Sequence, residues 1–363
     1  MLKQQKIFFD FLRFCIGSAK EIPGSLKEAD WKELYAIAQK QALLGVLFYG
    51  IQRLPKGLAP EQKLLMQWMV MAQQIRKQNI RLFQNSVKIC QNFENEGFAN
   101  CILKGQGNAL LYPDPYMRTP GDIDIYLLGG RRKIMKYVDQ VCPNQVMRYH
   151  HVDFPVMKTA IEVHFTPSYM FCPIHNRRMQ KWFEEVMGEQ CNHRGSLPDG
   201  YGEIHVPQVS FNVIYILSHL YRHIFTEGIG LRQLLDYYYV LISDDLLLIR
   251  DRVQKELKHL GLWKFAQAVM FMMKEVFGLS EDRMIAPMDE KEGRFLLDEI
   301  MRGGNFGQYD DRMGSKVGES KIHRYFRMNL RNLRFVKHYP TEAVCEPIFR
   351  TWFAGWKFIN RIK

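Results

Sequence analysis

The sequence lacks the cysteine patterns of disulfide frameworks and zinc ribbons. Its seven cysteines are scattered, odd in number and free of any CxxC pair. This distribution is typical of proteins in a reducing compartment, so we expect a cytoplasmic protein. One Cys/His set lies in an irregular stretch, but a single residue separates its second pair, which chelates one ion poorly. We therefore expect no zinc site from Cys172, His175, Cys191 and His193.

Long hydrophobic runs are also absent. No stretch of the sequence approaches the roughly 18–20 uninterrupted apolar residues of a membrane span. Lys3 and Lys6 precede an apolar run, but Asp10 and Arg13 interrupt it too early for the core of a signal peptide. We therefore expect no membrane span and no export. The sequence contains no internal repeat and no low-complexity segment.

Negative charge is the scarcer sign. The 363 residues include 50 Lys plus Arg against 38 Asp plus Glu, which gives a net charge of +12. Such a surface attracts anions, so nucleotides, nucleic acid or an acidic membrane face are possible partners. A dispersed soluble protein without such a partner explains the charge equally well. Apolar residues make up 47% of the chain, enough for a large core without covalent staples.

The first 97 residues have the periodicity of helices. Asp30 followed by Glu33 is a capping-box pattern and predicts a helix start. A second helix is predicted to begin near Pro60, whose fixed φ suits a first turn, and to end at Gly97. We expect residues 1–97 to form a helical N-terminal region.

The pattern changes at Phe98. Short apolar runs bounded by Gly, Pro and Asp predict strands there. Prolines and glycines then predict an irregular segment over residues 166–207. We expect residues 98–207 to form a small sheet domain. The predicted strands cover residues 98–103, 123–128, 146–154 and 159–165.

Helical periodicity returns at Val209 and continues to the end of the chain, apart from a polar, Gly-rich break over residues 302–319 that predicts a long loop. Residues 208–363 are therefore predicted to be a helical C-terminal region. The predicted fold class is α+β, with a small mixed sheet flanked by helical regions at both ends.

The central motif runs from Arg118 to Tyr126 and contains two aspartates. On a strand, Asp122 and Asp124 point to one face while the isoleucines between and after them pack on the other. Two close carboxylates repel each other unless a cation lies between them. Mg²⁺ suits them because it prefers oxygen ligands, and Mn²⁺ is an alternative. Arg118 is expected nearby, as a phosphate clamp or as a partner that orients the aspartates.

A second predicted strand supplies a third carboxylate. In residues 159–165, Glu162 and His164 share the polar face of the strand. In nucleotidyl transfer, two metal ions held by three carboxylates align the attacking and leaving oxygens. Asp122, Asp124 and Glu162 are therefore the candidate catalytic and metal-binding residues, and His164 is a candidate nucleotide contact.

A possible phosphate site precedes the aspartates. Lys104 and Gly105 end the first predicted strand and lead into a short predicted helix. Glycines let phosphate approach the backbone, helix-start amides favour anions, and Lys104 adds a positive charge. An ordinary strand-to-helix turn with a solvated lysine is the alternative. The adjacent carboxylates favour the phosphate interpretation.

These motifs resemble a bacterial family, the uncharacterised nucleotidyltransferases, within the polymerase-beta-like superfamily. The resemblance implies a minimal mixed-sheet core in which Asp122 and Asp124 hold a divalent metal ion and Glu162 is the third ligand. It implies an NTP substrate but names no acceptor. The superfamily's Gly-Gly or Gly-Ser pair is replaced here by Lys104-Gly105-Gln106, so triphosphate binding can differ. The matching residues are Leu103–Gly105, Tyr112–Pro115, Arg118, Gly121–Asp124, Glu162–His164 and, more loosely, His219, His223 and Gly230–Asp236.

The predicted function is transfer of a nucleoside monophosphate from an NTP to an unidentified hydroxyl on a protein, RNA or small molecule. A glycosyltransferase also uses DxD, but it would need alternating strands and helices ahead of that motif. A catalytically inactive nucleotide-binding or antitoxin-like protein is the other alternative. The missing glycine pair favours this alternative, whereas the third carboxylate argues against it.

The predicted helix after residue 208 carries several polar groups. His219 and His223 have a spacing that can bind zinc, with Asp236 as a third ligand, but hydrogen-bonded packing is the favoured interpretation. We expect this region to form one wall of the active-site cleft. Arg222 or Arg232 would then be placed to neutralise phosphate charge.

Basic and aromatic residues alternate near the C-terminus. The pattern can bind single-stranded nucleic acid or an anionic membrane surface. Two amphipathic helices with buried aromatics and solvated arginines are the commoner explanation. The residues are Arg324, Tyr325, Arg327, Arg331, Arg334, Phe335, Lys337, Phe349, Arg350, Trp352, Phe353, Trp356, Lys357 and Arg361.

Overall fold

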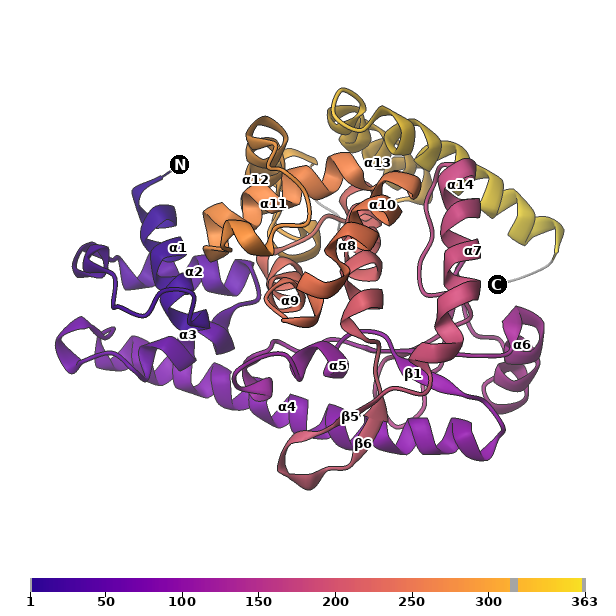
Figure 1. Ribbon diagram of the computed structural model, residues 1–363, viewed down its shortest axis with the longest axis horizontal. Helices are drawn as coiled ribbons and strands as arrows, with labels where there is room; N and C mark the ends of the chain where they lie inside the picture. The colour runs from indigo at the N-terminus through magenta and orange to yellow at the C-terminus, as the bar shows by residue number, and fades with distance from the viewer. Residues whose placement is uncertain (1, 314–318, 361–363) are drawn as a thin grey trace.

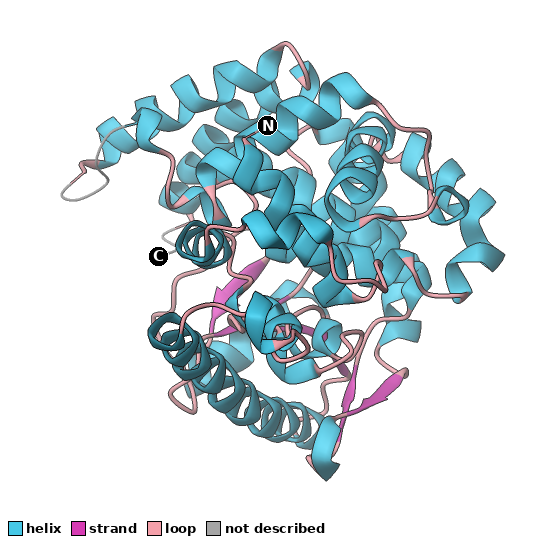
Figure 2. Cartoon of the chain, turned by 90° about the vertical axis from the view of Figure 1, so that its left-hand side faces the viewer, coloured by secondary structure: helices cyan, strands magenta, loops and turns pink. Residues whose placement is uncertain are grey.

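The computed structural model describes residues 2–313 and 319–360, and most of them are helical (Figures 1 and 2). None of the described helices is long and apolar enough to cross a bilayer. The helices are α1 (Lys3–Ile16), α2 (Trp31–Lys40), α3 (Leu44–Ile51), α4 (Gln62–Asn95), α5 (Gln106–Ala109), α6 (Gly130–Val141), α7 (Pro173–Gln190), α8 (Val209–Thr226), α9 (Leu231–Leu241), α10 (Asp245–His259), α11 (Trp263–Phe277), α12 (Glu290–Gly303), α13 (Lys321–Val336) and α14 (Pro340–Ile359). The strands are β1 (Asn100–Ile102), β2 (Ile123–Leu127), β3 (His151–Asp153), β4 (Ile161–His164), β5 (Arg194–Ser196) and β6 (Glu203–His205).

Helices α1–α4 precede the first strand, as the sequence predicts for the N-terminal region. The Asp30 carboxylate caps α2 by accepting hydrogen bonds from the backbone N–H groups of Lys32 and Glu33. Helix α4 starts two residues after Pro60 and ends just before Gly97, which adopts a φ of +75°. Both predicted helix starts are therefore confirmed.

Helix α4 connects the two halves of the molecule along its lower edge (Figure 1). Its 34 residues extend over roughly 50 Å at about 1.5 Å per residue. Trp68 and Ile75, in its first half, belong to the large helical core, whereas Phe83 and Phe93, in its second half, pack under the sheet. A single rigid element thus carries both parts of the fold.

The larger sheet is mixed and has the strand order β1-β2-β4-β3. Strands β2 and β4 are parallel, and the two outer pairs are antiparallel. The register places Asp124 opposite Glu162. This small mixed sheet within a mostly helical chain confirms the predicted fold class.

The two faces of this sheet differ in polarity. Ile123, Ile125 and Val163 are buried in an apolar cluster with residues of α4 and α6. Because side chains alternate along a strand, Asp124 and Glu162 lie on the opposite face. The sheet therefore presents its carboxylates toward α8 while its apolar face is sealed.

The segment from 166 to 207 is not irregular as expected. It contains α7 and the β5–β6 hairpin. Pro173 occupies the first turn of α7, a position where its missing N–H costs nothing. Trp182, Phe183 and Met187 bury one side of this helix. The prolines and glycines there are compatible with a helix and a hairpin and do not indicate an unstructured stretch.

Two other boundaries also shift. The strand predicted over residues 146–154 shrinks to β3, because the chain doubles back and Met147 forms an isolated bridge with Val152. The predicted break over residues 302–319 is occupied in part by short 3₁₀ turns after α12 ends at Gly303. Residues 314–318 of that break lie outside the described part of the chain.

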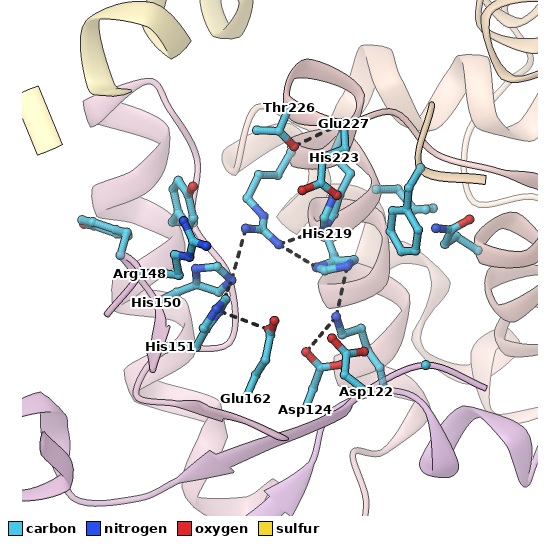
Figure 3. Close-up of a pocket in the computed structure, with 18 of the residues that line it drawn as sticks. Asp122, Asp124, Arg148, His150, His151, Glu162, His219, His223, Thr226 and Glu227 are labelled. Carbon is cyan, nitrogen blue, oxygen red and sulfur yellow. Dashed lines mark hydrogen bonds and ion pairs between the residues drawn. The ribbon is translucent and has the colours of Figure 1, made fainter. Parts of the chain in front are cut away.

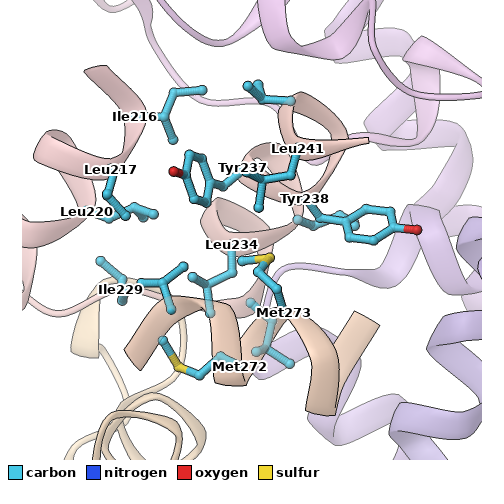
Figure 4. Packing of buried hydrophobic residues seen from close by; sticks show 14 of the residues in the cluster. Ile216, Leu217, Leu220, Ile229, Leu234, Tyr237, Tyr238, Leu241, Met272 and Met273 are labelled. Atoms are coloured by element: carbon cyan, nitrogen blue, oxygen red, sulfur yellow. The ribbon is translucent and has the colours of Figure 1, made fainter. Parts of the chain in front are cut away.

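The helices that precede the sheet in the sequence and those that follow it share one apolar core. Residues from α1 and α3 join those of α8–α12 in a single buried cluster. Figure 4 shows Leu220 of α8, Leu234 and Tyr237 of α9 and Met273 of α11 meeting within it. The proposed boundaries at residues 97/98 and 207/208 remain predictions.

A buried ion pair docks α9 onto the loop that leads into β2. Nε and Nη2 of Arg118 each lie 2.8 Å from a carboxylate oxygen of Asp236. The Tyr112 hydroxyl donates to the same carboxylate at 2.7 Å. Asn79 of α4 holds this loop from the other side by donating to the carbonyl oxygens of Tyr116 and Arg118. The loop is thereby fixed between two helices.

Removing one partner of this pair should destabilise the chain strongly. Asp236→Ala leaves the Arg118 guanidinium buried without its counterion, and we expect a loss of about 3–5 kcal/mol in the free energy of unfolding. Urea denaturation measures it. Glu185→Ala, which removes the exposed ion pair with Lys181, is the control and should change stability little. Equal effects of the two substitutions would contradict a structural role for Asp236.

Candidate active site

A pocket of about 550 Å³ opens between the polar face of the sheet and the helices beyond it. Asp122, Asp124 and Glu162 line its floor and point toward His219 and His223 on α8 (Figure 3). The structure therefore places the three candidate carboxylates in one cavity and makes α8 a wall of the same cavity. Their catalytic roles remain predictions.

Asp124 is almost fully buried, with 2% of its surface exposed. One of its oxygens, Oδ1, lies 3.0 Å from Nζ of Lys104 and 3.0 Å from Nε2 of His164. His164 also lies 3.5 Å from Oε2 of Glu162. The candidate nucleotide contact His164 is thus buried beneath the pocket, where it connects two carboxylates.

The charges of the two aspartates differ in how they are compensated. Burial opposes ionisation of Asp124, but Lys104 and His164 outweigh it and hold the pKa of Asp124 below its usual value. Repulsion from Asp124, together with burial, raises the pKa of Asp122 from 3.8 to about 6. Lys104 and His164 therefore compensate the negative charge of Asp124, whereas the negative charge of Asp122 remains unfavourable.

The donor set fits a hard divalent cation. Asp124, Glu162 and His164 each offer a ligand atom within 4.8 Å of the others, and His151, Asp153 and Glu162 form a second such group. Carboxylate oxygens around a partly uncompensated charge are the ligands that Mg²⁺ takes in nucleotide sites. Asp122 belongs to neither group, although it interacts electrostatically with both Asp124 and Glu162.

The residues of the expected phosphate site surround Asp122. Gly105 has a φ of +60°, and a Cβ there would lie 3.3 Å from the carbonyl oxygen of Asp122. Any other residue would therefore be strained at this position. The α5 helix that follows is only four residues long. Lys104 lines the pocket and reaches Nε2 of His219 at 3.2 Å.

The two candidate arginines lie in different environments. Arg118 is held by Asp236, so of its two expected roles the structure favours positioning of the loop over a free phosphate clamp. Arg232 is buried, and its Nη1 donates to the carbonyl oxygen of Thr119 at 3.0 Å. Arg232 forms no ion pair with any residue that the structure describes. Both arginines line the pocket.

The residues of the two possible zinc sets are arranged differently from what their spacing in the sequence allowed. Asp236 is bound to Arg118, so it is not free to join His219 and His223 as a ligand. Hydrogen-bonded packing of these histidines, the favoured interpretation, is confirmed. Of the Cys/His set, Cys172 and His175 group with Glu342 instead of with Cys191 and His193. The Nδ1 atom of His193 faces the carbonyl oxygen of Val206 at 2.9 Å.

Sequence reasoning missed the histidine pair at the start of β3. His150 and His151 are both buried and line the pocket, as does Asp153. Nδ1 of His151 lies 3.2 Å from Oε2 of Glu162. Two adjacent histidines in a predicted strand were the available signal, because one of them had to share the face of the carboxylates.

The C-terminal helices also close part of the pocket. Arg324 of α13 and Phe349, Arg350 and Phe353 of α14 contribute to its lining. The expected burial of aromatics holds for Phe335, which is 1% exposed, but fails for Trp352, which is 53% exposed. Conversely, Arg331 is buried instead of solvated. Arg361 lies outside the described residues.

Comparison with known proteins agrees with this geometry. The small mixed sheet with carboxylates on its open face is the arrangement expected of a nucleotidyltransferase core. The family of uncharacterised nucleotidyltransferases matches residues 27–278, more than half of the chain. The chain belongs to this family. No curated protein and no solved structure matches it in the other two comparisons.

The raised pKa of Asp122 predicts a pH-dependent effect of its removal. Between about pH 4 and pH 6 the folded chain binds a proton at Asp122 that the unfolded chain releases, so this contribution to stability is lost as the pH rises through about 6. In metal-free buffer, Asp122→Asn should raise the free energy of unfolding at pH 7 by about 1–3 kcal/mol. The gain should shrink toward pH 4.

Denaturation at several pH values in the presence of a chelator measures this effect. Asp139→Asn, on the exposed surface of α6, is the control for removal of one carboxylate. A gain that is constant from pH 4 to pH 7 would show that Asp122 is not destabilised by its charge.

Proposed function

We propose that the protein is a metal-dependent nucleotidyltransferase that transfers a nucleoside monophosphate from an NTP to a hydroxyl of an acceptor. The observation that carries this proposal is the pairing of Asp124 with Glu162 on adjacent parallel strands, with Asp122 next to them in one pocket. Family membership supports the same class of reaction.

The three carboxylates have distinct roles in this reaction. Asp122, Asp124 and Glu162 would hold Mg²⁺ or Mn²⁺, which lowers the charge of the α-phosphate and aligns the acceptor hydroxyl with it. Glu162 also accepts the proton of that hydroxyl. His164 keeps Asp124 and Glu162 at a fixed separation, since its Nε2 lies close to both. The acceptor oxygen replaces pyrophosphate on the α-phosphorus.

The cationic side chains of the pocket would bind the triphosphate. Lys104 compensates Asp124 in the ligand-free chain and is close enough to exchange that carboxylate for a phosphate oxygen. Arg232, buried beside the loop of Asp122, adds a second positive charge. Gly105 leaves the backbone open to phosphate. Binding of metal ion and nucleotide would thus satisfy carboxylates and cations together.

The two alternative functions are not equally supported. The residues described ahead of β1 are helical and include no strand, unlike the alternating pattern of a DxD glycosyltransferase. An inactive nucleotide-binding protein is favoured by one observation, the Lys104–Asp124 ion pair, which already neutralises a metal ligand. Turnover distinguishes this alternative from the proposed function.

Incubation with each α-³²P-labelled NTP, Mg²⁺ or Mn²⁺ and an acceptor panel of tRNA, protein, small alcohols and the chain itself tests the proposal. We expect transfer of label to one acceptor class. Asp124→Asn and Glu162→Gln should each reduce it by about 100-fold or more, because metal binding is lost. Asp139→Asn should leave it unchanged. Nucleotide binding without transfer in every combination would favour the inactive alternative.

Lys104 provides a separate test of the phosphate end. Lys104→Ala should weaken NTP binding by about tenfold or more, since a charge-assisted contact to phosphate is removed. Nucleoside binding should be unaffected. Isothermal titration calorimetry with ATP and with adenosine measures both constants. Equal losses for the two ligands would place Lys104 outside the phosphate site.

A further inference from the structure

Arg222 of α8 is a buried cation surrounded by histidines. It is 7% exposed and lines the pocket. Its Nη1 atom lies 3.1 Å from Nε2 of His150, and its Nη2 atom lies 3.2 Å from Nδ1 of His219 and 3.0 Å from Nε2 of His223. Figure 3 shows His150 and His219 above the carboxylates of the floor. The Tyr169 ring covers one side of the Arg222 guanidinium, 5.1 Å from the central carbon.

No carboxylate of the described chain forms an ion pair with Arg222. Two acidic groups that line the same pocket have other partners: Glu227 lies 3.7 Å from His223, and Glu346 pairs with Arg350 and accepts from Asn332. Burying a guanidinium without a counterion is unfavourable, and such charges are normally paired. The ligand-free site therefore has an unbalanced positive charge.

The histidines do not remove this charge. Burial holds the pKa values of His150, His219 and His223 well below their usual range, so each ring is neutral and offers a single lone pair. His219 meets two cations, Lys104 at Nε2 and Arg222 at Nδ1, and can accept a hydrogen bond from only one of them.

Hydrogen-bonding capacity also remains unused. Nε of Arg222 and Nδ1 of His150 are buried and have no partner among the residues that the structure describes. A purely structural network would be expected to satisfy such atoms. An anion that enters the pocket would offset the charge and give these groups an acceptor after small rotations.

We infer that Arg222, with His150, His219 and His223, forms a phosphate-binding subsite opposite the metal-binding carboxylates. A phosphate presents several acceptor oxygens, which can bind the unpaired guanidinium of Arg222 and the unpartnered Nδ1 of His150 together. The phosphate belongs either to the end of the NTP or to the acceptor. The assignment of this phosphate to an NTP or to an acceptor rests on the proposed function, but the affinity of the subsite for phosphate does not.

The test compares Arg222→Gln with the wild-type chain in metal-free buffer. Saturating inorganic phosphate should raise the melting temperature of the wild type clearly more than that of the variant. By calorimetry, the dissociation constant for phosphate should rise about tenfold or more. Without phosphate the variant should melt no lower than the wild type, because an uncompensated charge has been removed.

Two controls separate this role from a structural one. Arg131 is a partly buried arginine outside the pocket that donates to the Tyr149 carbonyl oxygen at 2.7 Å, and Arg131→Gln should bind phosphate as the wild type does. If Arg222→Gln does not fold, Arg222→Lys provides the test instead. This variant keeps the positive charge but loses the forked N–H donors of the guanidinium, so its affinity for phosphate should fall several-fold. Wild-type affinity in either Arg222 variant, or no phosphate binding by the wild type, overturns the inference.

Competition identifies the source of the phosphate. Displacement of inorganic phosphate by a non-hydrolysable ATP analogue assigns the subsite to the nucleotide's terminal phosphate. Unchanged phosphate affinity in the presence of saturating analogue assigns it to a phosphorylated acceptor. A failed transfer assay alongside normal phosphate binding would refute the proposed transferase activity and leave the subsite intact.

Discussion

The buried carboxylate of Asp124 sets the main constraint on this structure. A nearly inaccessible charge needs counter-charges at contact distance, and the chain supplies Lys104 from the end of β1 and His164 from β4. Those two contacts tie together β1, β2 and β4. Lys104 also reaches His219, so the same cluster of charges is linked to α8. Compensation of one aspartate thus connects the sheet with the helix that forms a wall of the pocket.

A second constraint is the position of the loop before β2. Asp122 lies in this loop, so its place relative to Asp124 depends on what holds the loop. Asn79 binds its carbonyl oxygens from α4, and the Arg118–Asp236 pair fixes it to α9. The N-terminal and C-terminal helices therefore both contribute to the site without supplying its carboxylates. This explains why a minimal four-stranded sheet is embedded in so much helix.

The sequence predicted those parts of the site that have a recognisable pattern over a few neighbouring residues. Alternation over a few residues identified β2 and β4, and the alternation also separated Asp124 and Glu162 from the isoleucines. Local patterns were insufficient for α7, because Pro173 is as compatible with a helix start as with a loop. They placed His150 in a predicted strand but not beside Arg222, and they gave no indication that Phe349 reaches the pocket, because both positions result from packing between segments far apart in the sequence. Such contacts depend on tertiary structure, which periodicity does not encode.

The charge distribution explains why the ligand-free pocket is unlike an ordinary protein interior. Its floor carries an aspartate whose ionisation is disfavoured by its neighbour, while its wall carries an arginine supported only by neutral rings. The chain does not pair these opposite charges with each other, although both border one cavity. Direct pairing would close the pocket and relieve both penalties. Their separation costs stability, and a ligand with a divalent cation at one end and phosphate at the other would recover it. Asp122 and Arg222, whose charges are least compensated in the ligand-free chain, are therefore the residues that best indicate what the pocket binds.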